Sequence, residues 1–427
     1  MNVTRCFWMM MPVVLGRFAF SAIAQPTESS AIDPPAGLGA MAPNLSTVDD
    51  GVVLTWLEPV EQKQTTGRDD HGRLRALRFA RYAGGGWTEP KTIVTRDDFF
   101  ANWADLPALV QAGDGTLFAH WLQKSAAATY AYDIVVARST DDGVTWRTLG
   151  RLHDDQTHSE HGFVSLVAEA NGVRAFWLDG REMVGDGGEG DLLGDAEPGS
   201  MTLRTAFVGR EIGPSTLIDD RVCECCNTSA VVTEGGAVVV YRDRSTDETR
   251  DIYIVRRVGD KWTDPKSLFL DGWQIAGCPV NGPAIAARGS HIVVTWFTGA
   301  TDSGSVRAVF STDGGARFSE PIAVDDTWPI GRVAVVLVKP GEAIVSWLDA
   351  GEGEGAIALR RVTADGAQGE PLIVAQTSGA RTIGFPMLAR SGSNLVLVWT
   401  QDAEPTRLRA VTISIGEIPK ESPTSNN

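Results

Sequence analysis

The chain has 427 residues, of which 43% are hydrophobic, and its formal net charge is −16 at pH 7. A chain of this length buries enough apolar surface to fold without disulfide or metal staples, so its five cysteines are not required for stability. The negative charge disfavours nucleic acid as a partner.

The first 24 residues have the pattern of a secretory signal peptide. Arg5 precedes an apolar stretch, which Arg17 interrupts, and Ala22-Ile23-Ala24 matches the small-residue pattern of a signal-peptidase site. We therefore expect cleavage after Ala24 and export to the periplasm or the medium. No other apolar run approaches membrane-spanning length, so we expect no transmembrane segment in the mature chain.

A hairpin unit recurs seven times along the rest of the chain. Each copy has an apolar run, a turn with Gly or Asn, and an alternating strand that ends near an aromatic residue, namely Trp56, Trp121, Trp177, Tyr241, Trp296, Trp347 or Trp399. A third strand and usually a fourth follow each hairpin. Short strands at regular spacing, with almost no helical periodicity, predict an all-β protein. Four strands per repeated unit predict a β-propeller.

Counting the innermost strands gives seven four-stranded blades in one domain. We expect an N-terminal segment at residues 25–42, the propeller at 43–417 and a disordered tail at 418–427. The short C-terminal unit would close the ring together with the N-terminal segment. A six-bladed propeller of the sialidase type and a two-domain β-sandwich are the alternatives, and the sandwich explains the spacing less well.

Two of the turns between third and fourth strands share a motif. Residues 139–146 have the sequence STDDGVTW and residues 311–318 have the sequence STDGGARF, which match the S-x-D-x-G-x-x-W/F Asp box. The serine and aspartate hold backbone N–H groups of the turn, and the glycine permits a positive φ. On these motifs the chain resembles the sialidase (BNR, Asp-box) superfamily of propellers. The resemblance implies a fold that serves hydrolases, lectin-like binders and scaffolds alike.

The loops that connect successive blades share one axial face and carry scarce, reactive side chains. Three neighbouring loops supply the residues of a candidate metal site, which are His153, His158, His161, Cys223, Cys225, Cys226 and Cys278. Thiolates select soft or borderline ions such as Cu(I) and Zn(II), and imidazoles extend the set of ligands. The sequence therefore predicts a copper or zinc site at this face.

Disulfides and thiol chemistry are alternatives for the cysteine triplet (Cys223, Cys225 and Cys226). A Cys225–Cys226 bridge would be strained, because adjacent Cα atoms lie only about 3.8 Å apart. A bridge from Cys278 to the triplet is the most reasonable structural pairing, and it leaves two thiols that need each other or a ligand. Redox or nucleophilic chemistry of the thiols is the third interpretation.

The resemblance also implies the residues of an exo-acting glycoside hydrolase. Sialidases use three arginines to clamp a carboxylate, a tyrosine nucleophile backed by a glutamate, and an aspartate as acid/base. Arg221, Arg332 and Arg381 lie in comparable blade-to-blade loops and could form the clamp, and Arg242 is a further candidate catalytic residue. Tyr130 and Tyr132 have no obvious glutamate partner, and the first unit lacks the family's Arg-Ile-Pro motif.

The acidic, glycine-rich insertion at residues 182–200 is either a lid over the axial mouth or a plain surface loop. Our leading interpretation is an exported, monomeric propeller that binds or handles a soft metal ion. The alternatives are a sialidase-like glycoside hydrolase and a non-catalytic propeller that binds a glycan or a protein. In these alternatives the partner is a small anionic or glycan ligand instead of a metal ion. Whether the protein is an enzyme stays open.

Overall fold

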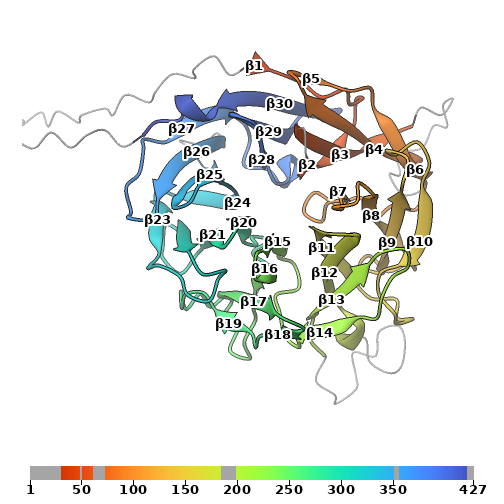
Figure 1. The fold of residues 1–427 in the computed structure, drawn as a ribbon, viewed down its shortest axis with the longest axis horizontal. Helices are drawn as coiled ribbons and strands as arrows, with labels where there is room; N and C mark the ends of the chain where they lie inside the picture. The colour runs from red at the N-terminus through yellow and green to blue at the C-terminus, as the bar shows by residue number, and fades with distance from the viewer. Residues whose placement is uncertain (1–29, 49–50, 61–72, 184–198, 351–354, 421–427) are drawn as a thin grey trace, which may run out of the picture.

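The structure is a computed structural model that describes residues 30–48, 51–60, 73–183, 199–350 and 355–420. These residues form seven antiparallel sheets arranged as a wheel around a central axis (Figure 1), which confirms the predicted seven-bladed, all-β propeller. The six-bladed alternative and the β-sandwich are therefore wrong. The predicted signal peptide, most of the insertion at 182–200 and most of the C-terminal tail lie outside the described residues.

The strands of each blade run in chain order from the axis outward, except at ring closure. Blade 1 contains β2 (Met41–Val48), β3 (Gly51–Pro59), β4 (Arg75–Ala83), β5 (Gly86–Trp87) and β6 (Lys91–Arg96). Blade 2 contains β7 (Ala108–Gln111), β8 (Leu117–Lys124), β9 (Tyr132–Ser139) and β10 (Arg147–Arg151). Blade 3 contains β11 (His161–Glu169), β12 (Gly172–Asp179), β13 (Thr202–Val208) and β14 (Thr216–Asp219), and the short 3-10 helix η1 (Arg181–Met183) follows β12.

The other four blades follow the same plan. Blade 4 contains β15 (Ser229–Thr233), β16 (Gly236–Arg242), β17 (Ile252–Val258), β18 (Lys261–Trp262) and β19 (Lys266–Ser267). Blade 5 contains β20 (Ala284–Arg288), β21 (His291–Thr298), β22 (Ser305–Ser311) and β23 (Ile322–Asp325). Blade 6 contains β24 (Pro329–Lys339), β25 (Glu342–Asp349), β26 (Ala356–Thr363) and β27 (Leu372–Gln376). Blade 7 contains β28 (Met387–Ser391), β29 (Asn394–Gln401), β30 (Arg407–Ser414) and β1 (Ser30–Ala31).

The outermost strand of blade 7 comes from the other end of the chain. β1 pairs antiparallel with β30, and Ser30 lies opposite Thr412. The Trp87 indole of blade 1 donates a hydrogen bond to the Ile32 carbonyl, which ties the closing strand to the first blade as well. This pairing covers the edge of β30 and joins the first and last blades. The N-terminal segment thus closes the ring, as the sequence suggested.

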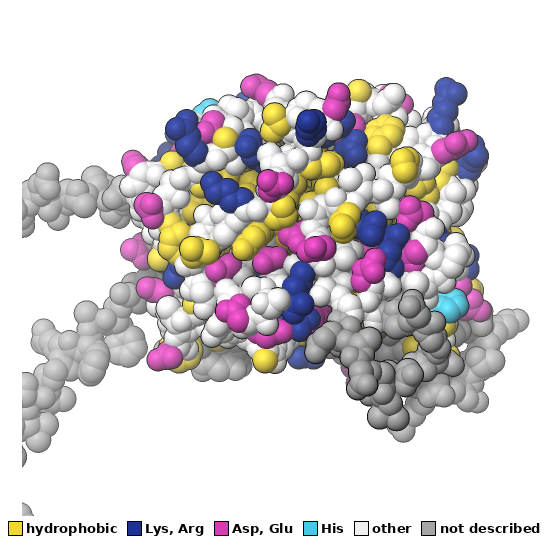
Figure 2. All heavy atoms as spheres, turned by 90° about the horizontal axis from the view of Figure 1, so that it is seen from below, with side chains coloured by type: hydrophobic (Ala, Val, Ile, Leu, Met, Phe, Trp, Pro, Cys, Tyr) yellow, Lys and Arg dark blue, Asp and Glu magenta, His cyan; other side chains and the backbone are white. Residues whose placement is uncertain are grey.

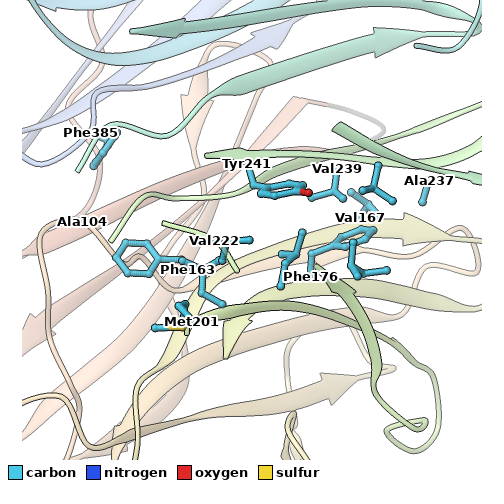
Figure 3. Packing of buried hydrophobic residues seen from close by; sticks show 14 residues of the cluster. Ala104, Phe163, Val167, Phe176, Met201, Val222, Ala237, Val239, Tyr241 and Phe385 are labelled. Carbon is cyan, nitrogen blue, oxygen red and sulfur yellow. The ribbon is translucent and has the colours of Figure 1, made fainter. Parts of the chain in front are cut away.

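Blades pack face to face, so their second strands are buried on both faces. The repeated aromatic residues lie near the ends of these strands, and Trp177 is fully buried with its indole N–H donating to Asp179 Oδ2 at 2.8 Å. A buried indole N–H without an acceptor would be costly, so the carboxylate two residues later stabilises the burial. Figure 3 shows the resulting packing between blades 3 and 4, where Phe176 meets Val239 and Tyr241.

The first Asp-box turn, from β9 to β10, is held by side-chain hydrogen bonds to its backbone. Ser139 Oγ accepts a hydrogen bond from the Gly143 N–H at 2.9 Å, and Asp141 Oδ1 accepts one from the Thr145 N–H at 2.9 Å. Gly143 has a φ of 75°, a conformation that favours glycine. The second box has the same two bonds, each at 3.0 Å. Both boxes therefore stabilise turns on the face opposite the blade-to-blade loops.

The innermost strands surround an axial cavity of about 280 Å³. Leu45, Ile285 and Val335 line it from three blades, and Asp105 and Asn227 line it from loops between blades. The blade-to-blade loops therefore open onto the central cavity. Figure 2 shows the side of the wheel, where acidic and basic side chains are interspersed. Among the described residues, no helix is long and apolar enough to cross a membrane.

Candidate functional site

Two loops that flank blade 4 supply four cysteines. The triplet lies between β14 and β15, and Cys278 lies between β19 and β20. The Cys223 N–H donates to the Arg242 carbonyl at 3.0 Å, which fixes the start of the triplet against the end of β16. All four cysteines are free thiols: Cys223 and Cys226 are buried, Cys225 is half-buried and Cys278 is exposed.

The three thiols of the triplet are in contact with one another, and Cys278 lies beside Cys225. Cys223 Sγ lies 3.0 Å from Cys226 Sγ and 3.9 Å from Cys225 Sγ. The three sulfur atoms of the triplet all lie within 4.8 Å of one another. Cys278 lies outside this set but near enough to Cys225 for each thiol to shift the pKa of the other. Tetrahedral zinc with Zn–S bonds of about 2.3 Å places its sulfur ligands about 3.8 Å apart. The triplet therefore fits such an ion once Cys226 moves slightly away from Cys223, and Cys278 is the candidate fourth ligand.

Arg250 donates a hydrogen bond to the triplet. It is 2% exposed, and its Nη1 donates to Cys223 Sγ at 3.2 Å and to Glu224 Oε2 at 2.9 Å. Its Nη2 donates to Glu248 at 2.9 Å, and Arg244 donates to the other oxygen of Glu224 at 2.9 Å. Two arginines and two glutamates therefore form a network that holds the triplet, and their charges balance one another.

The hydrogen bonds within the cluster concentrate negative charge on one sulfur. Burial opposes ionisation of Cys223, but its hydrogen bonds with the Cys225 and Cys226 thiols, and the charge of Arg250, hold its pKa well below the usual range. The bond with Cys223 raises the pKa of Cys225, and burial raises the pKa of Cys226. The neighbouring Cys225 thiol lowers the pKa of Cys278. A metal ion would displace the protons that the remaining thiols hold.

The candidate histidines do not lie with the cysteines. In the part of the chain that the structure describes, no set of three ligand atoms within 4.8 Å of one another combines a cysteine with a histidine. His153 and His161 are buried and stacked, with 3.7 Å between ring centroids and 7° between ring planes. His158 is exposed. The structure thus gathers the cysteines, and it places two of the three candidate histidines with carboxylates instead.

Carboxylates from β9 and from the β10–β11 loop surround the stacked histidines. His153 Nδ1 lies 2.8 Å from Asp155, and its Nε2 lies 3.3 Å from Asp133. These two carboxylates raise the pKa of His153, although burial opposes protonation. His161 Nε2 and Arg181 Nη2 each lie 3.3 Å from Asp155. Imidazole lone pairs lie in the ring plane, so parallel rings do not direct both at one ion. This geometry favours a network of charged side chains that fixes the β10–β11 loop, rather than a site in which both histidines bind one metal ion.

Two of the candidate arginines lie together over one aromatic ring. The guanidinium groups of Arg332 and Arg381 lie 4.8 Å and 6.0 Å from the centroid of Trp103. Arg332 Nη1 donates to the carbonyls of Ala380 and Gly384, each at 3.0 Å. Burial and the charge of Arg381 lower the pKa of Arg332 to about 10, and no acidic side chain among the described residues offsets this shift. The pair is therefore a candidate anion site.

The other two candidate arginines bind the protein backbone. Arg242 is 1% exposed and donates to three carbonyls, those of Arg250, Asn281 and Phe297. Arg221 Nε donates to the Arg244 carbonyl at 3.1 Å. The N–H groups of Arg221 and Arg242 that make these bonds position the loops around the triplet. Of the candidate arginines, the structure therefore supports only the pair Arg332 and Arg381 for binding a carboxylate.

Tyr132 lies in a buried acid cluster that was missed by the sequence reasoning, which found no glutamate partner for this tyrosine. Its hydroxyl donates to Glu160 Oε1 at 2.8 Å and lies 3.4 Å from Asp105 Oδ2. Burial raises the pKa of Asp105 to about 8 and that of Glu160 to about 7. Glu160 lies close after His158 in the β10–β11 loop, which connects two blades. This position was the only feature of the sequence that placed Glu160 near Tyr132.

Comparisons with known proteins support the fold. No family model matches the chain, and no curated protein matches it. The solved structure of the polysaccharide lyase Uly1 is 8% identical, with a TM-score of 0.51, and the match covers 92% of this chain and 94% of Uly1.

Two sialidase structures are also similar. The Hadza microbial sialidase Hz136 is 13% identical over 72% of this chain, with a TM-score of 0.41. The Trypanosoma rangeli sialidase in complex with the inhibitor DANA is 12% identical over 79% of this chain, with a TM-score of 0.45. This chain spans only 63% and 57% of the lengths of these two sialidases. The seven-bladed topology itself confirms the propeller fold that the resemblance implied, and the match to Uly1 over nearly the whole chain agrees with it.

Proposed function

We propose that this protein binds a soft metal ion, Cu(I) or Zn(II), through the thiols at one axial mouth of the propeller. The observation that carries the proposal is the cluster of three sulfur atoms of Cys223, Cys225 and Cys226, all within 4.8 Å of one another, with the Cys278 thiol of the next blade-to-blade loop beside Cys225. Four thiols from two loops provide a complete ligand set for either ion.

The local charges support an ion in this position. Glu224 and Glu248 already balance Arg244 and Arg250, so the thiolates that form when an ion binds would be neutralised by the ion itself and not by these arginines. Removing thiolates from water without such a cation is costly. Export through the N-terminal signal sequence is part of the proposal. In an oxidising compartment a bound ion would also protect the thiols from disulfide formation.

Metal analysis of the purified protein, together with a count of free thiols, tests this proposal. We expect about one copper or zinc ion per chain in the wild-type protein and a loss of most of this metal in Cys225→Ser. His158→Gln is the matched control, because this exposed histidine lies at the same face and should not change the metal content. A wild-type protein with four oxidised cysteines and no metal contradicts the proposal, as does a Cys225→Ser variant that keeps its ion.

A second candidate function is recognition of a carboxylate-bearing glycan at the same face. The specific observation in its favour is the Arg332–Arg381 pair over Trp103, whose positive charge no acid among the described residues offsets. Guanidinium groups bind planar carboxylates in a bidentate geometry. The Asp105–Tyr132–Glu160 cluster holds protons near neutral pH and would supply acid/base groups.

Binding and turnover measurements separate this candidate from ion binding. The ligands are a fluorogenic sialoside and a uronate oligosaccharide, which present the same carboxylate on different sugars. We expect Arg332→Met to abolish binding, whereas Arg317→Met, on an exposed Asp-box turn, should leave it unchanged. Equal affinities of both variants and the wild-type protein, or no binding of either ligand, contradict this candidate function without affecting the metal proposal.

A further inference from the structure

The four thiols are ordered by depth as well as by contact. Cys278 is exposed and Cys225 is half-buried, whereas Cys223 and Cys226 are 0% and 1% exposed. The interactions follow the same order: the Cys278 thiol interacts with that of Cys225, Cys225 Sγ lies 3.9 Å from Cys223 Sγ, and Cys223 Sγ lies 3.0 Å from Cys226 Sγ. A path of neighbouring sulfur atoms therefore runs from the surface to a buried Cys-x-x-Cys pair.

We propose that this path is a thiol–disulfide relay, in which Cys278 and Cys225 carry oxidation by a small-molecule disulfide to the buried pair Cys223 and Cys226. The proposal adds two-electron chemistry to the site. It does not depend on ion binding, because it concerns the reduced, metal-free protein.

Each step of the relay is an exchange between one sulfur atom and a disulfide. The Cys278 sulfur attacks an external disulfide RS–SR, which forms a mixed disulfide and releases one RSH. Cys225 then displaces the second RSH, and a Cys225–Cys278 bond forms. Cys223 attacks Cys225 and releases Cys278 as a thiol, after which Cys226 attacks Cys223 and releases Cys225. In total, Cys223 and Cys226 lose two electrons and two protons, and RS–SR gains them as two RSH.

The surroundings of the triplet support this order of steps. Cys223 Sγ contacts the sulfur atoms on either side of it in the path, so it is placed to receive the disulfide from Cys225 and to pass it to Cys226. Arg250 Nη1, at 3.2 Å, stabilises negative charge on Cys223 Sγ during both exchanges. A Cys225–Cys226 shortcut is strained, because adjacent cysteines are too close for an ordinary bridge.

Oxidation of the reduced, chelator-treated protein by glutathione disulfide tests the relay. The full chain is used with Cys6→Ser, so that only the four cysteines react, and the disulfides are identified by peptide mass mapping after alkylation. We expect a Cys223–Cys226 disulfide and two released glutathione molecules per chain. Cys278→Ser should slow formation of this disulfide by more than tenfold. Cys226→Ser should still form the Cys225–Cys278 bond, and circular dichroism checks that both variants fold.

Two results would overturn the relay. One is formation of the buried disulfide at the wild-type rate in Cys278→Ser, since the surface thiol would then have no part in the path. The other is a wild-type end product in which Cys225 and Cys278 are joined while Cys223 and Cys226 stay reduced. Neither result bears on the metal content measured in a separate preparation, so failure of the relay and failure of ion binding are distinguishable.

Discussion

Replacing Asp105 by asparagine tests the buried acid cluster. Asp105 is 2% exposed, and its Oδ1 has no hydrogen-bond partner among the described residues. Burial raises its pKa from the ordinary value of 3.8 to about 8. Between these two values the unfolded chain has released a proton that the folded protein retains. Stability should therefore fall as the pH rises from about 4 to about 8.

The size of the effect follows from the shift in pKa. Each pH unit between the two pKa values costs about 1.4 kcal/mol, and the slope flattens near the folded pKa. From pH 6 to pH 8 the contribution of Asp105 is therefore at most about 2 kcal/mol. Because asparagine has nearly the same shape and does not ionise, the stability of Asp105→Asn relative to the wild-type protein should rise by up to this amount over the same interval.

Urea unfolding of both proteins at pH 6, 7 and 8 measures this difference. Glu160, with a pKa of about 7, contributes to the pH dependence of both proteins, so the comparison isolates Asp105. Asp114→Asn is the control, because this exposed carboxyl has a lowered pKa and is ionised throughout the interval. Parallel loss of stability in the wild-type protein and Asp105→Asn would refute the assignment of a buried, protonated carboxyl.

Three further variants test the turn, the ring closure and the thiol cluster. Ser139→Ala removes the acceptor of the Gly143 N–H and should lower the free energy of unfolding by about 1–2 kcal/mol in urea titrations; an unchanged value contradicts the role of the box. Deleting residues 1–32 removes β1 and opens the edge of β30, so the midpoint of thermal unfolding should fall by several degrees, whereas an equal midpoint would show that the ring closes without it. Arg250→Met should raise the pKa of Cys223, which the pH dependence of thiolate ultraviolet absorbance reports, and a superimposable titration contradicts the assigned contact.

The architecture was predictable from sequence because each blade repeats the same physical requirements. Buried second strands need apolar runs, and residues such as Trp177 and Trp296 mark nearly every copy. The turns between strands need glycine at positions such as Gly143, where φ is positive. Since loops between successive blades emerge on one face, the gathering of the triplet and Cys278 also follows from chain order.

The detailed contacts of the site were not predictable, because they depend on side-chain directions across different elements. His153 pairs with Asp133 of β9, and Tyr132 at the start of β9 meets Glu160 of the β10–β11 loop. Sequence spacing does not show which of several loop acids lies nearest. The contact between Arg250 and Cys223 spans 27 positions and two strands, so no local pattern reveals it.

X-ray absorption spectroscopy of the metal-loaded protein tests the thiol centre most directly. The structure predicts a first coordination shell of three or four sulfur atoms at about 2.3 Å from the copper or zinc. A shell of nitrogen and oxygen alone, as the stacked histidines and their carboxylates would provide, contradicts the assignment of the ion to the cysteines.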